Sequence, residues 1–346
     1  MTSAWLTDID LSAIAERLRA ANSVTLLTHE KPDGDAVGST VALALALNRI
    51  DVSATVAYAG AWTDRFNAIA ANATVIKLGD QPDLSKLPES PDVVVITDTG
   101  SWSQLSLVRE WLEPRTDRAI VIDHHLHGDA GTAAHRHIDT GAAAVCETVA
   151  ELCRTVLCLD HARELPRDIA DALYLGLATD TGWFRHSNVT PDTLRLAAAL
   201  LEAGADHAKL FRTTEQQDKP GRLRLFARAL SSMELHHDNA IALITLTHDD
   251  LHASGAEMND AGGLTDMLLT IAQVRVGVSL TEVGEARTKI SFRSKTGDGA
   301  VRTVDVNKAA RTLGGGGHAQ AAGARLDLPV AEAKARVLDA LKGALS

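Results

Sequence analysis

Aspartate and histidine side chains follow four short apolar runs in the first half of the chain. In chain order, the runs and the residues after them are 24–28 with His29, Asp33 and Asp35, 93–97 with Asp98, 119–122 with Asp123, His124 and His125, and 173–178 with Asp180. Carboxylate and imidazole ligands together suit Mn²⁺, with Mg²⁺, Co²⁺ or Zn²⁺ as alternatives. Several carboxylates in one crevice repel one another, whereas two divalent cations would offset four negative charges. The pattern therefore predicts a site for two divalent cations.

Each piece of this pattern also has a structural interpretation when it is taken alone. Asp35 could cap a helix that begins near Ala36, and Asp33 with Gly34 could form a turn. A single aspartate such as Asp98 is common in a loop after a strand. The two histidines after Asp123 could lie at the surface. Four such coincidences after four apolar runs favour the metal site.

The apolar runs also predict the elements that position these side chains. The first three runs are short, continuous and rich in Val and Ile, which is typical of buried strands in a parallel sheet. The fourth run could be a strand or the end of a helix. Helix-like stretches at 36–49, 141–157 and 194–202 alternate with the runs. We therefore expect a doubly wound α/β fold, with the polar residues at the carboxyl edge of a mainly parallel sheet.

The second half of the chain has a different pattern of charged and apolar residues. Residues 206–229 are charged and helix-like, and strand patterns follow at 240–246, 274–280 and 288–294, with helix patterns near 303–312 and 330–345. This predicts a catalytic domain over 1–205, a helical linker over 206–229, and a smaller α/β domain with a mixed sheet over 230–346 that binds substrate.

Composition limits the classes of function. The net charge is -11 and aromatic residues make up 3% of the 346 residues, which argues against coating long duplex DNA and against an extended base-stacking platform. The three cysteines, Cys146, Cys153 and Cys158, form no CxxC pair and are expected in a buried core in a reducing compartment. No leader pattern and no apolar stretch of membrane-spanning length is present, so we expect a cytoplasmic protein without a membrane partner.

A glycine run, Gly314–Gly317, is followed by His318 and is the second motif that indicates a function. It could be a flexible linker, or its backbone amides could approach an anion, aided by the N-terminus of a following helix. The surrounding segment 286–325 is basic, with eight Lys and Arg residues, including Arg302, against Asp298 and Asp305. This contrast with the acidic chain favours an anion site.

The order and spacing of the first-half residues resemble the DHH phosphoesterase superfamily. The matching motifs are the segment 29–39, Asp98, the triplet Asp123-His124-His125, and Asp180-Thr181-Gly182. The resemblance implies that one metal is held by His29 and Asp33, a second by Asp35, His124 and Asp180, and both by Asp98. It further implies that His125 faces the substrate phosphate, that Asp123 orients the histidines, and that a hydroxide between the metals attacks phosphorus.

The glycine run with Phe292-Arg293-Ser294 resembles the DHH-associated C-terminal domain of compact NrnA-type oligoribonucleases. This implies that Arg293, Ser294, Gly315, Gly316, Gly317 and His318 bind the substrate. Such enzymes degrade short RNA, and many remove the 3'-phosphate from 3'-phosphoadenosine 5'-phosphate (PAP). Alanine-rich actinobacterial relatives also cleave cyclic di-AMP and pApA, and a homodimer is expected from relatives.

Two other functions are compatible with parts of this pattern. A pyrophosphatase or polyphosphatase would use the same metals, but the glycine run argues against it. A non-enzymatic nucleotide sensor would be expected to have lost a metal ligand, and all of the positions are present.

A few further segments can be interpreted from their sequence alone. The sequence departs from the family pattern at 126–129 and at 142–147. We interpret His236-His237-Asp238 as a solvated turn and the segment around His135 and His137 as a surface loop. The segment Trp183-Phe184-Arg185 could contribute to a base pocket, and core packing by Trp183 or Phe184 is the alternative.

Overall fold

The computed structural model describes residues 5–284, 286–297 and 303–345. Asp298 and Arg302 of the basic segment lie outside the described residues. The chain divides into two compact units, Met1–Gln217 and Asp218–Ser346. Helix α8 (His207–Glu215) belongs to the first unit and α9 (Pro220–Ser231) to the second. No helix in the described ranges has the length and apolar character that a membrane span requires.

Six parallel strands form sheet A of the first unit. Their order is β3-β2-β1-β4-β5-β6, and their bounds are β1 (Ser23–Leu27), β2 (Ser53–Ala59), β3 (Thr74–Gly79), β4 (Val93–Thr97), β5 (Ala119–Asp123) and β6 (His135–Ile138). The strand order reverses between β1 and β4, and ligands of such sheets bind outside the carboxyl ends of the strands at this switch point. The predicted strands β1, β4 and β5 are confirmed, as is the parallel α/β fold.

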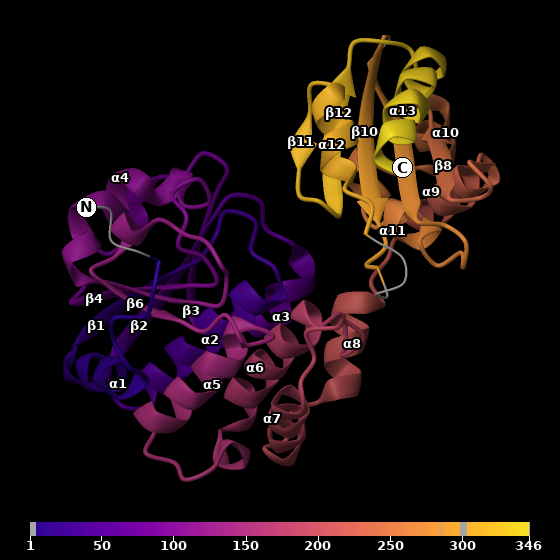
Figure 1. Cartoon of the computed structure of the whole chain (residues 1–346). Helices are drawn as coiled ribbons and strands as arrows, with labels where there is room; N and C mark the ends of the chain where they lie inside the picture. The colour runs from indigo at the N-terminus through magenta and orange to yellow at the C-terminus, as the bar shows by residue number, and fades with distance from the viewer. Residues whose placement is uncertain (1–4, 285, 298–302, 346) are drawn as a thin grey trace. The chain divides into compact units, whose positions relative to one another are not determined.

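Helices cover both faces of sheet A. Figure 1 shows α2, α5, α6 and α7 together on one side of the sheet and α4 on the other. The bounds are α1 (Leu11–Ala20), α2 (Gly34–Asn48), α3 (Asn67–Ala70), α4 (Arg109–Leu112), α5 (Val145–Val156), α6 (Arg167–Asp180) and α7 (Pro191–Glu202). One apolar core lies between the sheet and α1, α2, α5 and α6, and a second lies under α4. The fourth apolar run lies inside α6, so Asp180 ends a helix.

Two glycines allow α2 and α6 to approach closely. A Cβ built on Gly38 would lie 2.4 Å from the carbonyl oxygen of Ala172, and one on Gly176 would lie 2.8 Å from Oδ1 of Asp35. Contacts this short require the backbone to move. The glycines therefore set the distance between the helices that present Asp35 and Asp180.

We expect Gly38→Ala to lower the free energy of unfolding by about 1–3 kcal/mol, because the added methyl group overpacks this contact. Urea denaturation would measure the change. Gly343→Ala is the matched control, since Gly343 is also helical and a Cβ added there would have nothing within 4 Å. The control should raise stability by about 0.5–1 kcal/mol. Equal effects of the two substitutions would contradict the close-packing interpretation.

Two predictions about the first unit were wrong in detail. The segment with His135 and His137 is the edge strand β6 rather than a surface loop. Its amide groups pair with β5 and with the N-terminal segment, where Thr7 and Asp8 lie. Cys146 and Cys153 are buried as expected, whereas Cys158 is exposed because it follows the end of α5.

The second unit contains the expected mixed sheet, sheet B. Its order is β11-β12-β10-β9-β8-β7, with bounds β7 (Glu234–His236), β8 (Ile241–Leu246), β9 (Val276–Gly284), β10 (Arg287–Ser294), β11 (Gly316–Gly317) and β12 (Ala321–Leu326). Only the β8–β9 pair is parallel among the described pairs of this sheet. The helices are α9, α10 (His248–Ser254), α11 (Leu264–Leu268), α12 (Val306–Thr312) and α13 (Val330–Leu345).

The glycine run differs from its predicted structure. Gly316 and Gly317 form β11 at the sheet edge, and the element that follows is the strand β12 rather than a helix. A Cβ on Gly315 would lie 2.1 Å from the carbonyl oxygen of Gly323. Close pairing with β12 thus requires glycine, and no helix dipole acts directly after the run.

Candidate metal centre

The structure brings together all eight acidic and histidine residues predicted for the first unit. Their ligand atoms form three overlapping groups, each within 4.8 Å: His29, Asp33 and Asp98; Asp35, His124 and Asp180; and Asp98, Asp123, His124 and His125. Asp98 belongs to two of these groups. Since β1 and β4 meet at the switch point of sheet A, the cluster lies where a doubly wound sheet binds its ligand.

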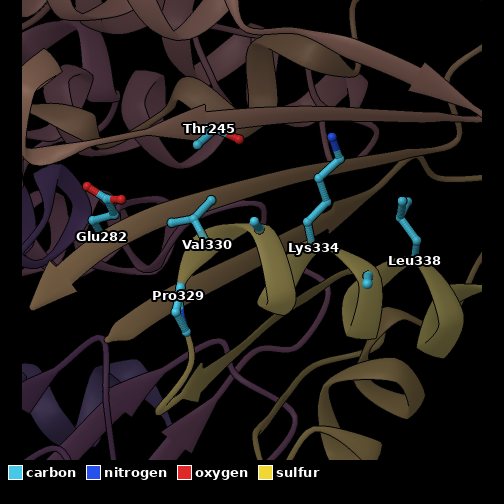
Figure 2. A pocket seen from close by; sticks show the side chains of 8 residues that line it. Thr245, Glu282, Pro329, Val330, Lys334 and Leu338 are labelled. Atoms are coloured by element: carbon cyan, nitrogen blue, oxygen red, sulfur yellow. The ribbon is translucent and has the colours of Figure 1, made fainter. Parts of the chain in front are cut away.

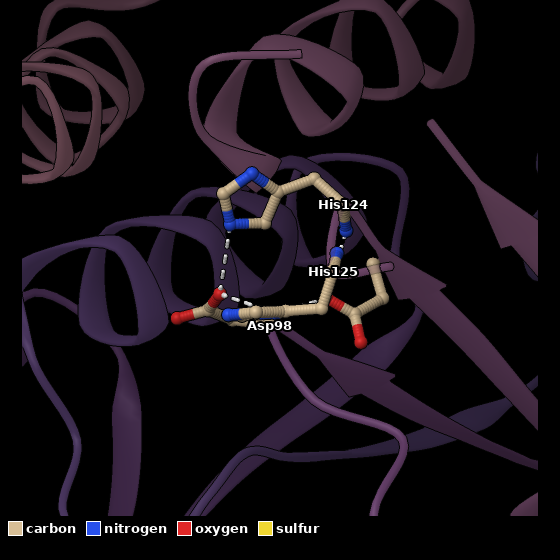
Figure 3. A group of neighbouring side chains, drawn as sticks. Asp98, His124 and His125 are labelled. Atoms are coloured by element: carbon tan, nitrogen blue, oxygen red, sulfur yellow. Dashed lines mark hydrogen bonds and ion pairs between the residues drawn. The ribbon is translucent and has the colours of Figure 1, made fainter. Parts of the chain in front are cut away.

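Asp98 lies between two histidines. Its Oδ2 is 3.5 Å from Nε2 of His29, and its Oδ1 is 3.5 Å from Nε2 of His124. Figure 3 shows the carboxylate of Asp98 directed towards the His124 ring. Asp98 also has a φ of 62°, a left-handed conformation that costs on the order of 1 kcal/mol or more outside glycine. The fold thus holds this carboxylate between the two imidazoles at the expense of an unfavourable backbone conformation.

His29 and Asp33 lie on the loop between β1 and α2. The Nε2 of His29 is 3.9 Å from Oδ1 of Asp33. Asp33 is the N-cap of α2, where its Oδ1 accepts hydrogen bonds from the amides of Asp35 and Ala36. The cap fixes this carboxylate at the start of the helix, so the helix cap predicted as an alternative for Asp35 is formed by Asp33 instead.

Asp35 is held by a different helix. Its carboxylate is 1% exposed and accepts hydrogen bonds from the amides of Val145 (2.6 Å) and Cys146 (3.0 Å), in the first turn of α5. Ala144, the N-cap of α5 in the alanine-rich segment 142–147, offers no side-chain cap. Asp35 caps α5 from α2 and is fixed in the cluster.

The ring of His124 is oriented by a backbone carbonyl. Its Nδ1 lies 3.2 Å from the carbonyl oxygen of Ala142, so this nitrogen is the donor of the neutral ring. Once the ring is neutral, the other nitrogen, Nε2, carries no proton; it lies 4.0 Å from Asp35 and 3.8 Å from Asp180. This tautomer is the one that a metal ligand requires.

Asp123 forms hydrogen bonds with both residues of the histidine pair. It is fully buried, and its Oδ1 accepts hydrogen bonds from the amides of His124 (2.7 Å) and His125 (3.2 Å). The same oxygen is 2.7 Å from Nδ1 of His125. This hydrogen bond raises the pKa of His125 despite partial burial, so the ring favours its protonated, donating form. The side chain of His125 is 52% exposed.

The donor set fits divalent cations. The N–O distances of 3.5–4.0 Å around Asp98, His29 and His124 are too long for strong hydrogen bonds. They suit two ligand atoms of one ion, which lie about 3 Å or more apart. Burial, together with the charges of Asp98 and Asp180, raises the pKa of Asp35 well above its usual range. Burial also raises the pKa of Asp180 to about 6. Buried carboxylates in this state are stabilised as anions when cations bind.

We expect Mn²⁺ binding near neutral pH to release protons. Burial lowers the pKa of His29, but Asp33 and Asp98 outweigh it and raise the value to about 9. His124 is affected in the same way, with a pKa of about 10 through burial opposed by Asp98 and Asp35. Both rings are therefore protonated at about pH 7.5 and must lose a proton to bind metal, so affinity rises with pH. Calorimetric titration in two buffers with different ionisation enthalpies measures this release, and a heat independent of the buffer would contradict it.

The comparison with known proteins assigns the chain to a family. The DHH family N-terminal domain matches residues 23–177, and the DHHA1 domain matches residues 240–346. The chain is 32% identical over 338 residues to a Thermus thermophilus protein named bifunctional oligoribonuclease and PAP phosphatase NrnA, covering 96% of this chain and 94% of that protein. The chain belongs to the DHH family.

Other relatives agree with this assignment. A Bacillus subtilis protein of the same name is 26% identical to this DHH protein, over 88% of this chain and 90% of the relative. The solved structure of an exopolyphosphatase-related protein from Bacteroides fragilis superimposes with a TM-score of 0.82 at 24% identity, covering 96% of this chain and 95% of the other. The latter likeness shows a shared fold.

A cavity of about 290 Å³ opens beside Asp33 and Asp180 of the DHH domain. Three basic side chains line it, Arg65, Arg185 and His186, and only Arg185 was considered from the sequence. Arg185 belongs to the segment after the Asp180 motif that was considered for a base pocket, whereas Arg65 lies in the short helix η1 (Asp64–Phe66), far from any motif.

A larger cavity lies elsewhere. It measures about 690 Å³, belongs to the DHHA1 domain, and is lined by parts of α13, β8 and β9, including Lys334 and Glu282 (Figure 2). No predicted substrate-binding residue lines it. Size alone therefore does not locate the chemistry, and the carboxylate and imidazole cluster is the stronger indication.

The predicted substrate residues of the DHHA1 domain are only partly brought together. Arg293 pairs with Ala321 in the β10–β12 ladder, which places it at the same end of sheet B as His318, in the turn between β11 and β12. Its Nε lies 3.2 Å from Oδ1 of Asp266. Ser294 is the next residue on the strand, so its buried side chain faces the opposite side of the sheet from Arg293.

The remaining sequence interpretations are resolved by local structure. His236 ends β7, and His237 and Asp238 form the left-handed turn that follows. Trp183 and Phe184 pack against the main apolar core of the first unit, and Trp183 contacts Phe211 edge to face. These contacts favour core packing for Phe184, whereas Trp183 also lines the cavity beside Asp33 and Asp180.

Proposed function

We propose that this protein is a metal-dependent phosphoesterase that hydrolyses short oligoribonucleotides and dinucleotides, such as pApA, cyclic di-AMP and nanoRNA. The 3'-phosphate of PAP is a further substrate. The observation that supports this most strongly is Asp98 between His29 and His124, 3.5 Å from each. The full-length similarity to an oligoribonuclease and PAP phosphatase supports the substrate class.

His29, Asp33 and Asp98 would hold one cation, and Asp35, His124, Asp180 and Asp98 the second. Mn²⁺ is the expected metal, because the ligands mix carboxylates and imidazoles. When bound, such cations lower the pKa of water from about 15.7 to about 7 and stabilise negative charge on phosphoryl oxygens.

The chain's own residues prepare the substrate for this chemistry. The hydrogen bond from Nδ1 of His125 to Asp123 raises the pKa of the ring and so favours its protonated form, in which the other nitrogen, Nε2, can donate a hydrogen bond to a phosphoryl oxygen. Two guanidinium groups, those of Arg65 and Arg185, line the adjacent cavity together with the carboxylates of Asp33, Asp180 and Glu215. Cations held by Asp33 and Asp180 would offset these two carboxylates, and the two arginines would then attract an anionic substrate.

In the DHHA1 domain, His318, Arg293, Ser294 and the glycines 315–317 are proposed to contact the substrate. We expect His318→Ala to raise KM for pApA about tenfold while the metals are retained, since a charge-assisted contact to phosphate contributes about 1.5 kcal/mol. Steady-state kinetics with metal analysis measures both effects. His252→Ala, an exposed histidine on α10, is the control. An unchanged KM in His318→Ala would remove this role.

A substrate panel with Mn²⁺ tests the function. It contains pApA, cyclic di-AMP, PAP, short RNA and inorganic pyrophosphate. We expect turnover of the nucleotide substrates and little turnover of pyrophosphate. Hydrolysis of pyrophosphate alone would favour the pyrophosphatase alternative, and the absence of any turnover would contradict the proposal.

A further inference from the structure

The N-terminal segment Trp5–Ile9 lies along β6, the edge strand of sheet A. The amide of Asp8 donates to the carbonyl oxygen of Arg136 (2.9 Å), and the amide of Arg136 donates to Oδ1 of Asp8 (2.9 Å). The amide of Ile138 donates to Oγ1 of Thr7 (2.8 Å). Arg136 is 7% exposed, and its guanidinium also bonds to the Asp8 carboxylate. These bonds fix the segment along β6.

Trp5 extends from this segment to the triplet loop. Its indole N–H donates a hydrogen bond of 3.0 Å to the backbone carbonyl of His125. Among the described residues, no other hydrogen bond is made to this carbonyl. The bond joins residues 120 positions apart in sequence, so it is a tertiary contact on the loop that carries the proposed phosphate-binding histidine.

Two glycines make room for the indole ring. A Cβ built on Gly100 would lie 1.8 Å from the ring, and one on Gly128 would lie 2.5 Å from it. Gly100 follows Asp98 by two positions, and Gly128 follows His125 by three. The ring therefore contacts both loops that present the centre of the metal cluster.

The same two loops are bound to each other. The amide of Asp129 donates to the carbonyl oxygen of Gly100 (2.7 Å), and the amide of Trp102 donates to Oδ2 of Asp129 (2.8 Å). The segment 126–129, which departs from the family pattern, thus supplies the glycine beneath Trp5 and the carboxylate that joins the loops.

We propose that Trp5 is a positioning residue for His125. The indole N–H fixes the peptide plane after His125, and the ring fixes the loop on either side of it. This orientation matters because the imidazole is half exposed and its only hydrogen-bonding partner among the described side chains is Asp123. The proposal rests on the proposed function, in which His125 contacts the substrate phosphate.

Trp5→Phe removes the N–H donor and keeps an aromatic ring. We expect it to lower kcat on pApA about three- to tenfold, which corresponds to one hydrogen bond, with KM and metal content unchanged. Gly128→Ala, which displaces the indole, should act in the same direction. Trp111→Phe is the matched control, because Trp111 also donates to a backbone carbonyl, that of Pro88, outside the cluster. It should leave kcat unchanged.

A double-mutant cycle with His125→Ala separates positioning from general destabilisation. If Trp5 acts through His125, Trp5→Phe should have no further effect on kcat in the His125→Ala background. The same fold-loss in both backgrounds would overturn the proposal. Crystal structures give a readout that is independent of activity: the His125 ring should occupy one position in the wild type and be displaced or multiple in Trp5→Phe. If no nucleotide is hydrolysed, the proposed function fails, while an unchanged His125 in the variant crystal would still overturn the positioning role.

Discussion

Replacing Asp98 with asparagine is expected to lower kcat on pApA by about a thousandfold or more. Each carboxylate oxygen of Asp98 lies 3.5 Å from a different histidine, so the side chain is placed to serve both proposed metals. Asparagine replaces one oxygen with an amide nitrogen that cannot bind a cation, and it removes the negative charge between the two ions. A loss of several kcal/mol in transition-state stabilisation corresponds to this factor.

Asp51→Asn is the control for this substitution. Asp51 has a φ of 62°, the same left-handed value as Asp98, but it is exposed in the turn after α2. The control therefore repeats the chemical change in the same backbone conformation, away from the cluster, and should leave kcat unchanged. Turnover of Asp98→Asn near that of the wild type would exclude a bridging role for Asp98.

Asp123→Asn is expected to lower kcat about 10- to 100-fold with both metals retained. Such losses are typical when a residue that orients metal ligands or their neighbours is changed. Oδ1 of Asp123 accepts from two backbone amides and pairs with His125, while its buried Oδ2 has no hydrogen-bonding partner. An amide group would place an unsatisfied donor at that position and would weaken the bond that holds His125 in its donating form.

Steady-state kinetics and metal analysis of Asp123→Asn measure this effect. Asp92→Asn is the matched control, because the Asp92 carboxylate also accepts from two backbone amides, those of Asn22 and Ser23, away from the cluster. Loss of metal from Asp123→Asn would show that Asp123 is itself a ligand, and an unchanged kcat would show that it does not orient His125.

The sequence predicts the centre of sheet A better than its edges. Strands β1, β4 and β5 are continuous apolar runs, because both of their faces are buried. The edge strand β6 reads His-Arg-His-Ile and has no such pattern. Segment β6 is a strand because it pairs with β5 on one side and with the N-terminal segment on the other. These partners are distant in sequence, so the local pattern of β6 does not reveal them.

In the candidate site, too, the sequence predicts the residues but not the distant partners that position them. Spacing after the apolar runs predicted the eight clustered residues. Seven of them lie at the carboxyl ends of β1, β4 and β5, which meet at one edge of the sheet, and Asp180 joins them from the end of the helix α6. The spacing did not predict what holds them in place. Asp35 is bound by α5 amides 110 and 111 positions away, and the carbonyl of His125 by Trp5, 120 positions away. Contacts at such separations depend on the packed fold rather than on local periodicity.

The DHHA1 domain shows a further limit of sequence motifs. The glycine run was expected to precede a helix, but close pairing of β11 with β12 accounts for glycine at these positions. Arg293 and Ser294 are adjacent in the motif, yet strand alternation places their side chains on opposite faces of β10. A motif identifies which residues occur together in sequence, and the secondary structure decides which of them can touch one ligand.

Anomalous scattering from crystals equilibrated with Mn²⁺ tests the central claim most directly. We predict two manganese peaks about 3.5–4 Å apart, the separation of two-metal sites, with Asp98 between them. His29 and Asp33 should contact one peak, and Asp35, His124 and Asp180 the other. A single peak, or two peaks that do not share Asp98, would contradict the two-metal centre.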